Sequence, residues 1–157
     1  MRDVTTVSQT TGGSAHPLEH MRVALQMEIP SDVRYIERVV DLIVRQCEEL
    51  AYPDRLVHLN VPVALTEALS NAILRGNAES PSKHVHVRAA VDRERLVIEV
   101  VDEGTGFDLD GCTIDPTRPE NLTREDGRGL YLMRQLMDQV ERYSADGNVV
   151  RMVLRRP

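Results

Sequence analysis

Two pairs of apolar runs, each joined by a short polar turn, constrain the fold of this chain more than any other feature. Residues 84–91 and 96–101 flank four charged residues, and residues 140–144 and 149–154 flank the turn dipeptide Asp146-Gly147. Each pair predicts a β-hairpin. Hairpins build antiparallel sheet, so they argue against alternating strand–helix–strand units with a parallel sheet.

A further strand and a helix precede these hairpins. Residues 23–29 alternate loosely and predict a first strand, which Pro30 closes. Ser31-Asp32 then supplies an N-cap for a helix. Apolar residues at three- and four-residue spacings place one stripe of that helix against a core: Val33, Ile36, Val39, Val40, Ile43, Val44 and Cys47.

Two more helices are predicted from the same spacing. The second is expected to begin near Asn60, with Pro62 in its first turn, and to run towards Gly76. The polar segment 109–126 predicts a loop, and a third helix follows it. The inward positions of the third helix are expected to be Leu130, Met133, Leu136, Met137 and Val140.

These elements predict an α+β fold: a two-layer sandwich with a mixed, mostly antiparallel sheet covered on one face by helices. Residues 1–20 are rich in Thr, Ser and Gly without apolar periodicity, and we expect a flexible N-terminal arm. Residues 21–157 are expected to form one domain, since the 157 residues are too few for two ordinary ones.

Composition excludes several functions. A net charge of -6 argues against a nucleic acid as the main partner, because phosphate backbones select basic surfaces. No apolar run reaches the length of a membrane span, and no signal-peptide pattern opens the chain. The two cysteines, Cys47 and Cys112, are too few for a disulfide scaffold and do not form a metal-type pair. We therefore expect a cytoplasmic protein with no membrane contact.

Glu67 and Asn71 lie four residues apart on the second predicted helix, so they project from one face. Such a pair can place a carboxylate beside a hydroxyl and an amide oxygen on Mg²⁺, a cation that takes oxygen ligands and keeps several waters. Taken alone, the pair is more typical of a solvated helix face, because polar pairs at this spacing are common on helices.

Asp102 ends the apolar run 96–101, and Gly104 and Gly106 follow it. A carboxylate at this strand end can accept a hydrogen bond from an adenine amino group, while the glycines allow the backbone to lie against the ring. The alternative is an ordinary turn after a strand, in which Asp and Gly are common.

Gly127 and Gly129 lie where the third helix is expected to begin. Unpaired N–H groups at a helix start, together with the positive end of the helix dipole, bind phosphate. Arg128 or Arg124 would add a charged fork to the phosphates. The spacing matches neither a Walker-type P-loop nor a dinucleotide fingerprint.

Taken together, the segments 65–73, 101–107 and 127–133 resemble, in the right order, the nucleotide-binding boxes of the histidine-kinase-like (Bergerat-fold) ATPases. Within that superfamily the chain is most similar to the bacterial anti-sigma-factor serine/threonine kinases. The resemblance covers residues 60 to 154, and the segment 23–50 also suits that subfamily.

The resemblance implies ATP and Mg²⁺ as cofactors and gives each residue a role. Glu67 would be the general base that accepts the proton of an incoming serine hydroxyl, and Asn71 would bind Mg²⁺. Asp102 would hold the adenine amino group, with Gly104 and Gly106 shaping the pocket. The far side of the ATP lid would contact the phosphates through the glycines and their neighbours: Arg124, Gly127, Arg128, Gly129 and Leu130.

The implied function is an ATP-dependent serine/threonine kinase that phosphorylates a small anti-sigma-factor antagonist with the sulfate-transporter/antagonist (STAS) fold. It would also act as an anti-sigma factor in a partner-switching pathway, bind a sigma factor and form a homodimer. One alternative is a nucleotide-binding regulatory module that sequesters a partner without phosphotransfer. Another is a detached histidine-kinase catalytic domain, which would need a separate histidine acceptor.

Two residues depart from the family's pattern. Arg75 stands where a histidine is frequent, and Asn148 follows Gly147 where many members carry a threonine near the adenine. Either change is expected to alter nucleotide affinity or lid closure rather than to abolish binding.

Overall fold

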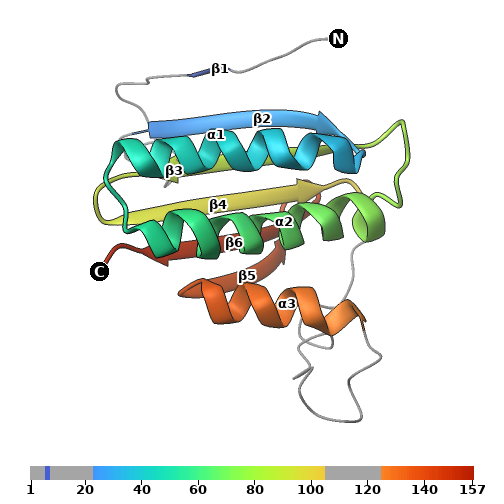
Figure 1. The fold of residues 1–157 in the computed structure, drawn as a ribbon. Coiled ribbons are helices and arrows are strands. Elements are labelled where there is room, and N and C mark those ends of the chain that lie inside the picture. Colours follow the sequence, from blue (N-terminus) through green and yellow to red (C-terminus); the bar gives the residue numbers. More distant parts are fainter. Residues whose placement is uncertain (1–5, 8–22, 105–124) are drawn as a thin grey trace.

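The computed structural model describes residues 6–7, 23–104 and 125–157, which form one sheet with helices on one of its faces (Figure 1). The sheet has six strands in the order β1-β2-β3-β4-β6-β5, and each neighbouring pair is antiparallel. The predicted α+β sandwich is confirmed. The strands are β1 (Thr6–Val7), β2 (Val23–Pro30), β3 (His84–Val91), β4 (Arg95–Asp102), β5 (Gln139–Ser144) and β6 (Asn148–Arg155).

Both predicted hairpins are present. In the first, Val91 pairs with Leu96 across the charged turn. In the second, Ser144 pairs with Asn148, and the intervening Asp146 and Gly147 have φ values of 50° and 126°. A left-handed turn of this kind favours Asp and Gly, which explains why the dipeptide marks it in the sequence.

The first helix also follows the prediction. A short 3-10 turn, η1 (Val33–Tyr35), leads into α1 (Ile36–Glu49). The Asp32 carboxylate caps the turn by accepting a hydrogen bond from the Arg34 N–H at 2.9 Å. Ser31, by contrast, does not cap the helix: its hydroxyl donates to the Lys83 carbonyl at 2.6 Å, so it joins β2 to the start of β3.

The second helix begins earlier than predicted. Residues 54–76 form one continuous helical stretch, in which the π-helical turns η2 (Leu56–Asn60) and η3 (Ala72–Gly76) flank α2 (Val61–Asn71). Pro62 therefore lies inside the stretch and not in its first turn. A proline inside an α-helix clashes with the carbonyl four residues back, and the wider turn η2 changes the spacing of those carbonyls.

The third helix, α3 (Glu125–Leu136), begins two residues before Gly127. Leu130 and Met133 are buried in the core, as predicted, and Met137 is buried just after the helix ends. Val140 lies in β5 instead of the helix, where it packs half-buried against the same core. Asp138, whose N–H donates to the Val153 carbonyl, marks the change from helix to strand.

The helices cover only one face of the sheet, and a buried carboxylate lies on the other. Glu99 is 2% exposed. Its carboxylate forms an ion pair with Arg88 at 3.1 Å and a longer one with Arg151 at 3.9 Å. The Tyr143 hydroxyl donates to the same carboxylate at 3.2 Å. Burial, followed by the charge of Glu99, raises the pKa of Tyr143. This cross-strand cluster ties β3, β4, β6 and β5 together.

The structure describes little of the predicted N-terminal arm, and the helices that it does describe are not of the membrane-spanning kind. Of the predicted arm, only Thr6 and Val7 are described, and they pair with Gln26 and Leu25 at the edge of β2. The remainder of 1–20 lies outside the described residues. Within 6–7, 23–104 and 125–157, no helix combines the length and apolar character needed to cross a bilayer.

Candidate functional site

Asp102 is the last residue of β4, and its carboxylate is 3% exposed. One oxygen, Oδ1, accepts hydrogen bonds from the Gly104 N–H and from the Asn148 side-chain amide, both at 2.9 Å. The Asn148 amide also donates to the Gly104 carbonyl at 2.7 Å. The hydrogen bonds from these described residues all go to Oδ1, and the other carboxylate oxygen, Oδ2, is also of a kind that accepts hydrogen bonds.

Glycines bring the backbone close to this carboxylate. A Cβ placed on Gly76 would overlap the Asp102 carboxylate, and one placed on Gly104 would overlap the Gly76 carbonyl. A Cβ on Gly147 would stand 2.6 Å from the Asp102 carbonyl oxygen. Three glycines from three separate segments therefore surround the end of β4, and any larger residue at 76 would fill the space beside Oδ2.

Glu67 and Asn71 share one face of α2, as predicted, and that face meets α3. A Cβ on Gly129 would stand 2.5 Å from the Glu67 Oε2 atom and 3.4 Å from the Asn71 Nδ2 atom. Both side chains are half-buried. The glycine at 129 thus allows α3 to lie directly against the predicted base and the predicted magnesium ligand.

The start of α3 differs from the expectation in one respect. Because the helix begins at Glu125, the unpaired N–H groups belong to residues 125–128, and Gly129 lies in the second turn. Arg128 is exposed at this end of the helix, whereas the Leu130 side chain is 1% exposed and belongs to the core. A ligand would therefore contact Leu130 only through its backbone.

One helical stretch, residues 54–76, connects the two groups of residues. Glu67 and Asn71 occupy its middle, and Gly76, which contacts Asp102, ends it. Glu67 and Gly76 are nine positions apart, a rise of about 13 Å along a helix axis. An elongated ligand with a hydrogen-bond donor at one end and anionic oxygens at the other fits this separation, as an adenine nucleotide with its phosphates does.

The residues present are compatible with Mg²⁺ held together with a nucleotide. Among the described residues, no group of three His, Cys, Asp or Glu side chains is placed to hold a metal ion by itself. Asn71 offers one amide beside the Glu67 carboxylate. A cation with one or two protein ligands takes its remaining ligands from phosphates and water.

Some contributors were not predicted from the sequence. Gly76 was expected only to end a helix, and Asn77, which is fully buried beside it, was not predicted to have a role. Asn148 was predicted to alter nucleotide affinity or lid closure, and its side-chain amide donates to the Asp102 carboxylate. Gly106 and Arg124 lie outside the described residues, and of Gly127 only its place in the backbone of α3 is described.

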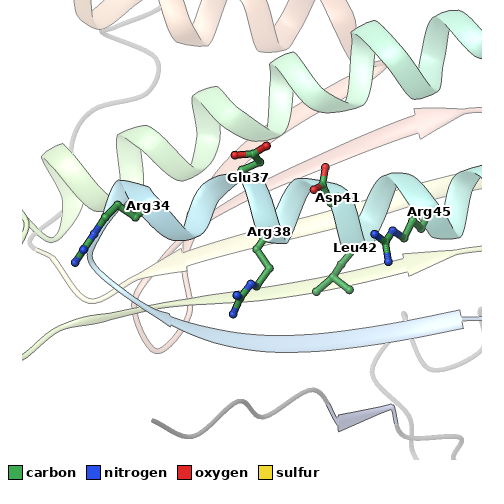
Figure 2. A pocket seen from close by; sticks show the side chains of 6 residues that line it. All are labelled: Arg34, Glu37, Arg38, Asp41, Leu42 and Arg45. Atoms are coloured by element: carbon green, nitrogen blue, oxygen red, sulfur yellow. The ribbon is translucent and has the colours of Figure 1, made fainter.

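A groove of about 430 Å³ lies away from these residues, along the outer side of α1 (Figure 2). Glu37 and Asp41 leave the helix on one side, and Arg38 and Leu42 leave it on the other. The groove contains none of the predicted site residues. Its full lining is Arg34, Glu37, Arg38, Asp41, Leu42 and Arg45.

Comparison with known proteins identifies the family of this fold. Residues 29–154 match the model of the histidine kinase-like ATPase domain. The chain is 30% identical over 134 residues to the serine-protein kinase RsbW of Bacillus subtilis, covering 82% of each protein. It is 29% identical over 100 residues to the anti-sigma F factor of Clostridium beijerinckii, covering 62% of this chain and 68% of that protein.

Proposed function

This chain belongs to the family of histidine kinase-like ATPase domains, and we propose that it is an ATP-dependent protein serine/threonine kinase that also acts as an anti-sigma factor. One observation carries the proposal. Glu67 and Asn71 lie against Gly129 of α3, and the helical stretch that carries them ends at Gly76, against the buried Asp102 carboxylate. The names of the relatives, a serine-protein kinase and an anti-sigma factor, support both halves of it.

Each residue has a task in phosphoryl transfer. Asp102 accepts a hydrogen bond from the adenine amino group through Oδ2, because Oδ1 is already occupied by two donors. Asn71 would hold Mg²⁺, which when bound neutralises charge on the phosphates. Glu67 accepts the proton of the serine hydroxyl while that oxygen attacks the γ-phosphorus and ADP leaves.

A base beside the phosphate end favours the kinase over a nucleotide-binding regulator. A module that only senses nucleotide needs Asp102 and the glycines, but it has no use for a carboxylate next to the helix start. The helix start itself supplies N–H groups and the positive end of a dipole, which stabilise phosphate oxygens. Glu67 then provides the one group that phosphate binding alone does not require.

The resemblance to the anti-sigma-factor kinases implies the partners, and the name of one relative, an anti-sigma factor, supports a sigma factor among them. The kinase substrate would be a small anti-sigma-factor antagonist of the STAS fold, and a sigma factor would be the second partner, both in the cytoplasm. A homodimer would form through β2 and α1, whose outward face carries cations and anions in alternation: Arg34, Glu37, Arg38, Asp41 and Arg45 (Figure 2). Such a mixed face is suited to pairing with a second copy.

Phosphotransfer to a co-purifying protein tests the proposal. The chain is isolated from its native cell, and the small protein bound to it is incubated with it and γ-labelled Mg-ATP. Acid-stable label on a serine or threonine, reduced by about 10²-fold or more in Glu67→Gln, supports the kinase. Glu48→Gln, an exposed carboxylate on α1, is the matched control and should retain full activity.

The other outcomes separate the alternatives. Acid-labile label would identify a histidine acceptor and so a detached histidine-kinase domain. Partner binding without any label would identify a regulatory module. Equal labelling by the wild type and Glu67→Gln would remove the role assigned to the base.

A further inference from the structure

Asn77 connects four segments at the end of the sheet where the candidate site lies. Its side chain is 0% exposed. The amide nitrogen donates to the Ser31 hydroxyl and to the His84 carbonyl, both at 2.9 Å. The amide oxygen accepts from the Glu103 N–H at 2.7 Å. One side chain thus joins the residue after the helical stretch to β2, β3 and β4.

The hydrogen bond from the Glu103 N–H to the Asn77 amide oxygen holds the residue that directly follows Asp102. The backbone beyond Asp102 leaves β4 and reaches Gly104, which contacts the Gly76 carbonyl. Glu103 is held a second time, because its carboxylate accepts from the His84 N–H. The Asn77 oxygen therefore fixes the backbone between Asp102 and Gly104, and Gly76 lies on the other side of the same carboxylate.

From this geometry we infer that Asn77 is a positioning residue for base recognition: it orients the Asp102 carboxylate towards the 6-amino group of adenine. The inference rests on the proposed function, since it assigns Asn77 a role in the same nucleotide site. Because Asn77 is fully buried and its amide is taken up by Ser31, His84 and Glu103, its effect on the nucleotide would pass through Asp102. Without its amide oxygen, the turn after β4 would lose the bond that anchors it to the end of the helical stretch.

The test compares ATP with purine riboside triphosphate, which lacks the 6-amino group, by calorimetric titration in the presence of Mg²⁺. Wild type should bind ATP about 10- to 100-fold more tightly, the range of a charge-assisted hydrogen bond. In Asn77→Ala the preference should fall to about threefold or less. The affinity for purine riboside triphosphate should change little, because the phosphate end of the site is intact.

Two more variants keep the test decisive. Asn77→Ser leaves a polar atom in the buried position but is too short to accept from Glu103, so it should lose the preference even if Asn77→Ala fails to fold. Ser31→Ala removes a bond from the same network without touching Glu103. Ser31→Ala should lower the melting temperature but keep the preference for ATP.

The outcomes separate this inference from the proposed function. No preference for ATP in the wild type would remove Asp102 from base recognition and with it the proposed site. A wild-type preference that Asn77→Ser retains would overturn the inference and leave the proposed function in place. An equal loss of affinity for both nucleotides in Asn77→Ser would also overturn it, because a purely structural role predicts that result.

Discussion

Replacing Gly129 with alanine should separate the stability of this protein from its activity. The new Cβ would stand 2.5 Å from the Glu67 Oε2 atom, about 1 Å closer than an ordinary van der Waals contact. The carboxylate lies at the far end of a flexible, half-buried side chain, so it can move aside without a shift of backbone. Alanine is favoured over glycine inside a helix by about 0.5–1 kcal/mol. The fold should therefore be as stable as the wild type or slightly more so.

Activity should respond differently, because Glu67 is the proposed base. A displacement of about 1 Å costs on the order of 10²-fold in a step that depends on geometry. We expect single-turnover phosphotransfer at saturating Mg-ATP to fall by that factor, while urea denaturation shows no loss of stability. ATP affinity should change little, because Asp102 and Gly76 are unaffected.

A double-mutant cycle with Glu67→Gln shows whether Gly129→Ala lowers the phosphotransfer rate by displacing the Glu67 carboxylate. If Gly129 acts through the carboxylate, adding Gly129→Ala to Glu67→Gln should reduce the residual rate by less than about twofold, since coupled residues are not additive. A full additional loss in the double variant would show that Gly129 affects the rate independently of the Glu67 carboxylate. A Gly129→Ala protein with wild-type activity would refute the reasoning.

Three further perturbations test other parts of the structure. Gly104→Ala should lose about 2 kcal/mol or more of unfolding free energy in urea, because its Cβ overlaps the Gly76 backbone; wild-type stability would contradict that contact. Glu99→Ala should cost about 1–3 kcal/mol in the same assay, since it leaves Arg88 without its buried partner, and an unchanged midpoint would contradict the cluster. Burial raises the pKa of the Tyr52 hydroxyl above its ordinary 10.0, so its contribution to stability is complete below pH 10.0 and is lost as pH rises further. The unfolding free energy of Tyr52→Phe should therefore fall less steeply with pH above 10.0 than that of the wild type. Equal slopes for the two proteins would contradict this.

The sheet could be predicted because its signal is local. Both hairpins combine alternating apolar residues with a short polar turn, and the turn at Asp146-Gly147 requires the φ values that these residues tolerate. The start of the second helix could not be predicted in the same way. Pro62 usually marks a first turn, and nothing in the sequence indicates that the π-helical turn η2 would carry the helix past it.

The residues of the candidate site also differ in whether a local sequence pattern reveals them. Glu67, Asn71 and Asp102 were predicted because their spacing on a helix or at a strand end is visible in the sequence. Asn77 was missed because its partners, Ser31 and Glu103, are distant in the sequence and meet it only in the folded chain. Asn148 was read as a departure from a pattern, and only its hydrogen bond to Asp102 shows what it does.

Titration of Mg-ATP into Asp102→Asn shows whether the Asp102 carboxylate recognises adenine. The asparagine oxygen can accept from Gly104 and Asn148 as Oδ1 does, so the fold should be retained, with an amide nitrogen in place of Oδ2. A donor there faces the donor of adenine, and ATP affinity should fall by about 30-fold or more. Undiminished binding of Mg-ATP by a folded Asp102→Asn protein would contradict the role of the Asp102 carboxylate in adenine recognition.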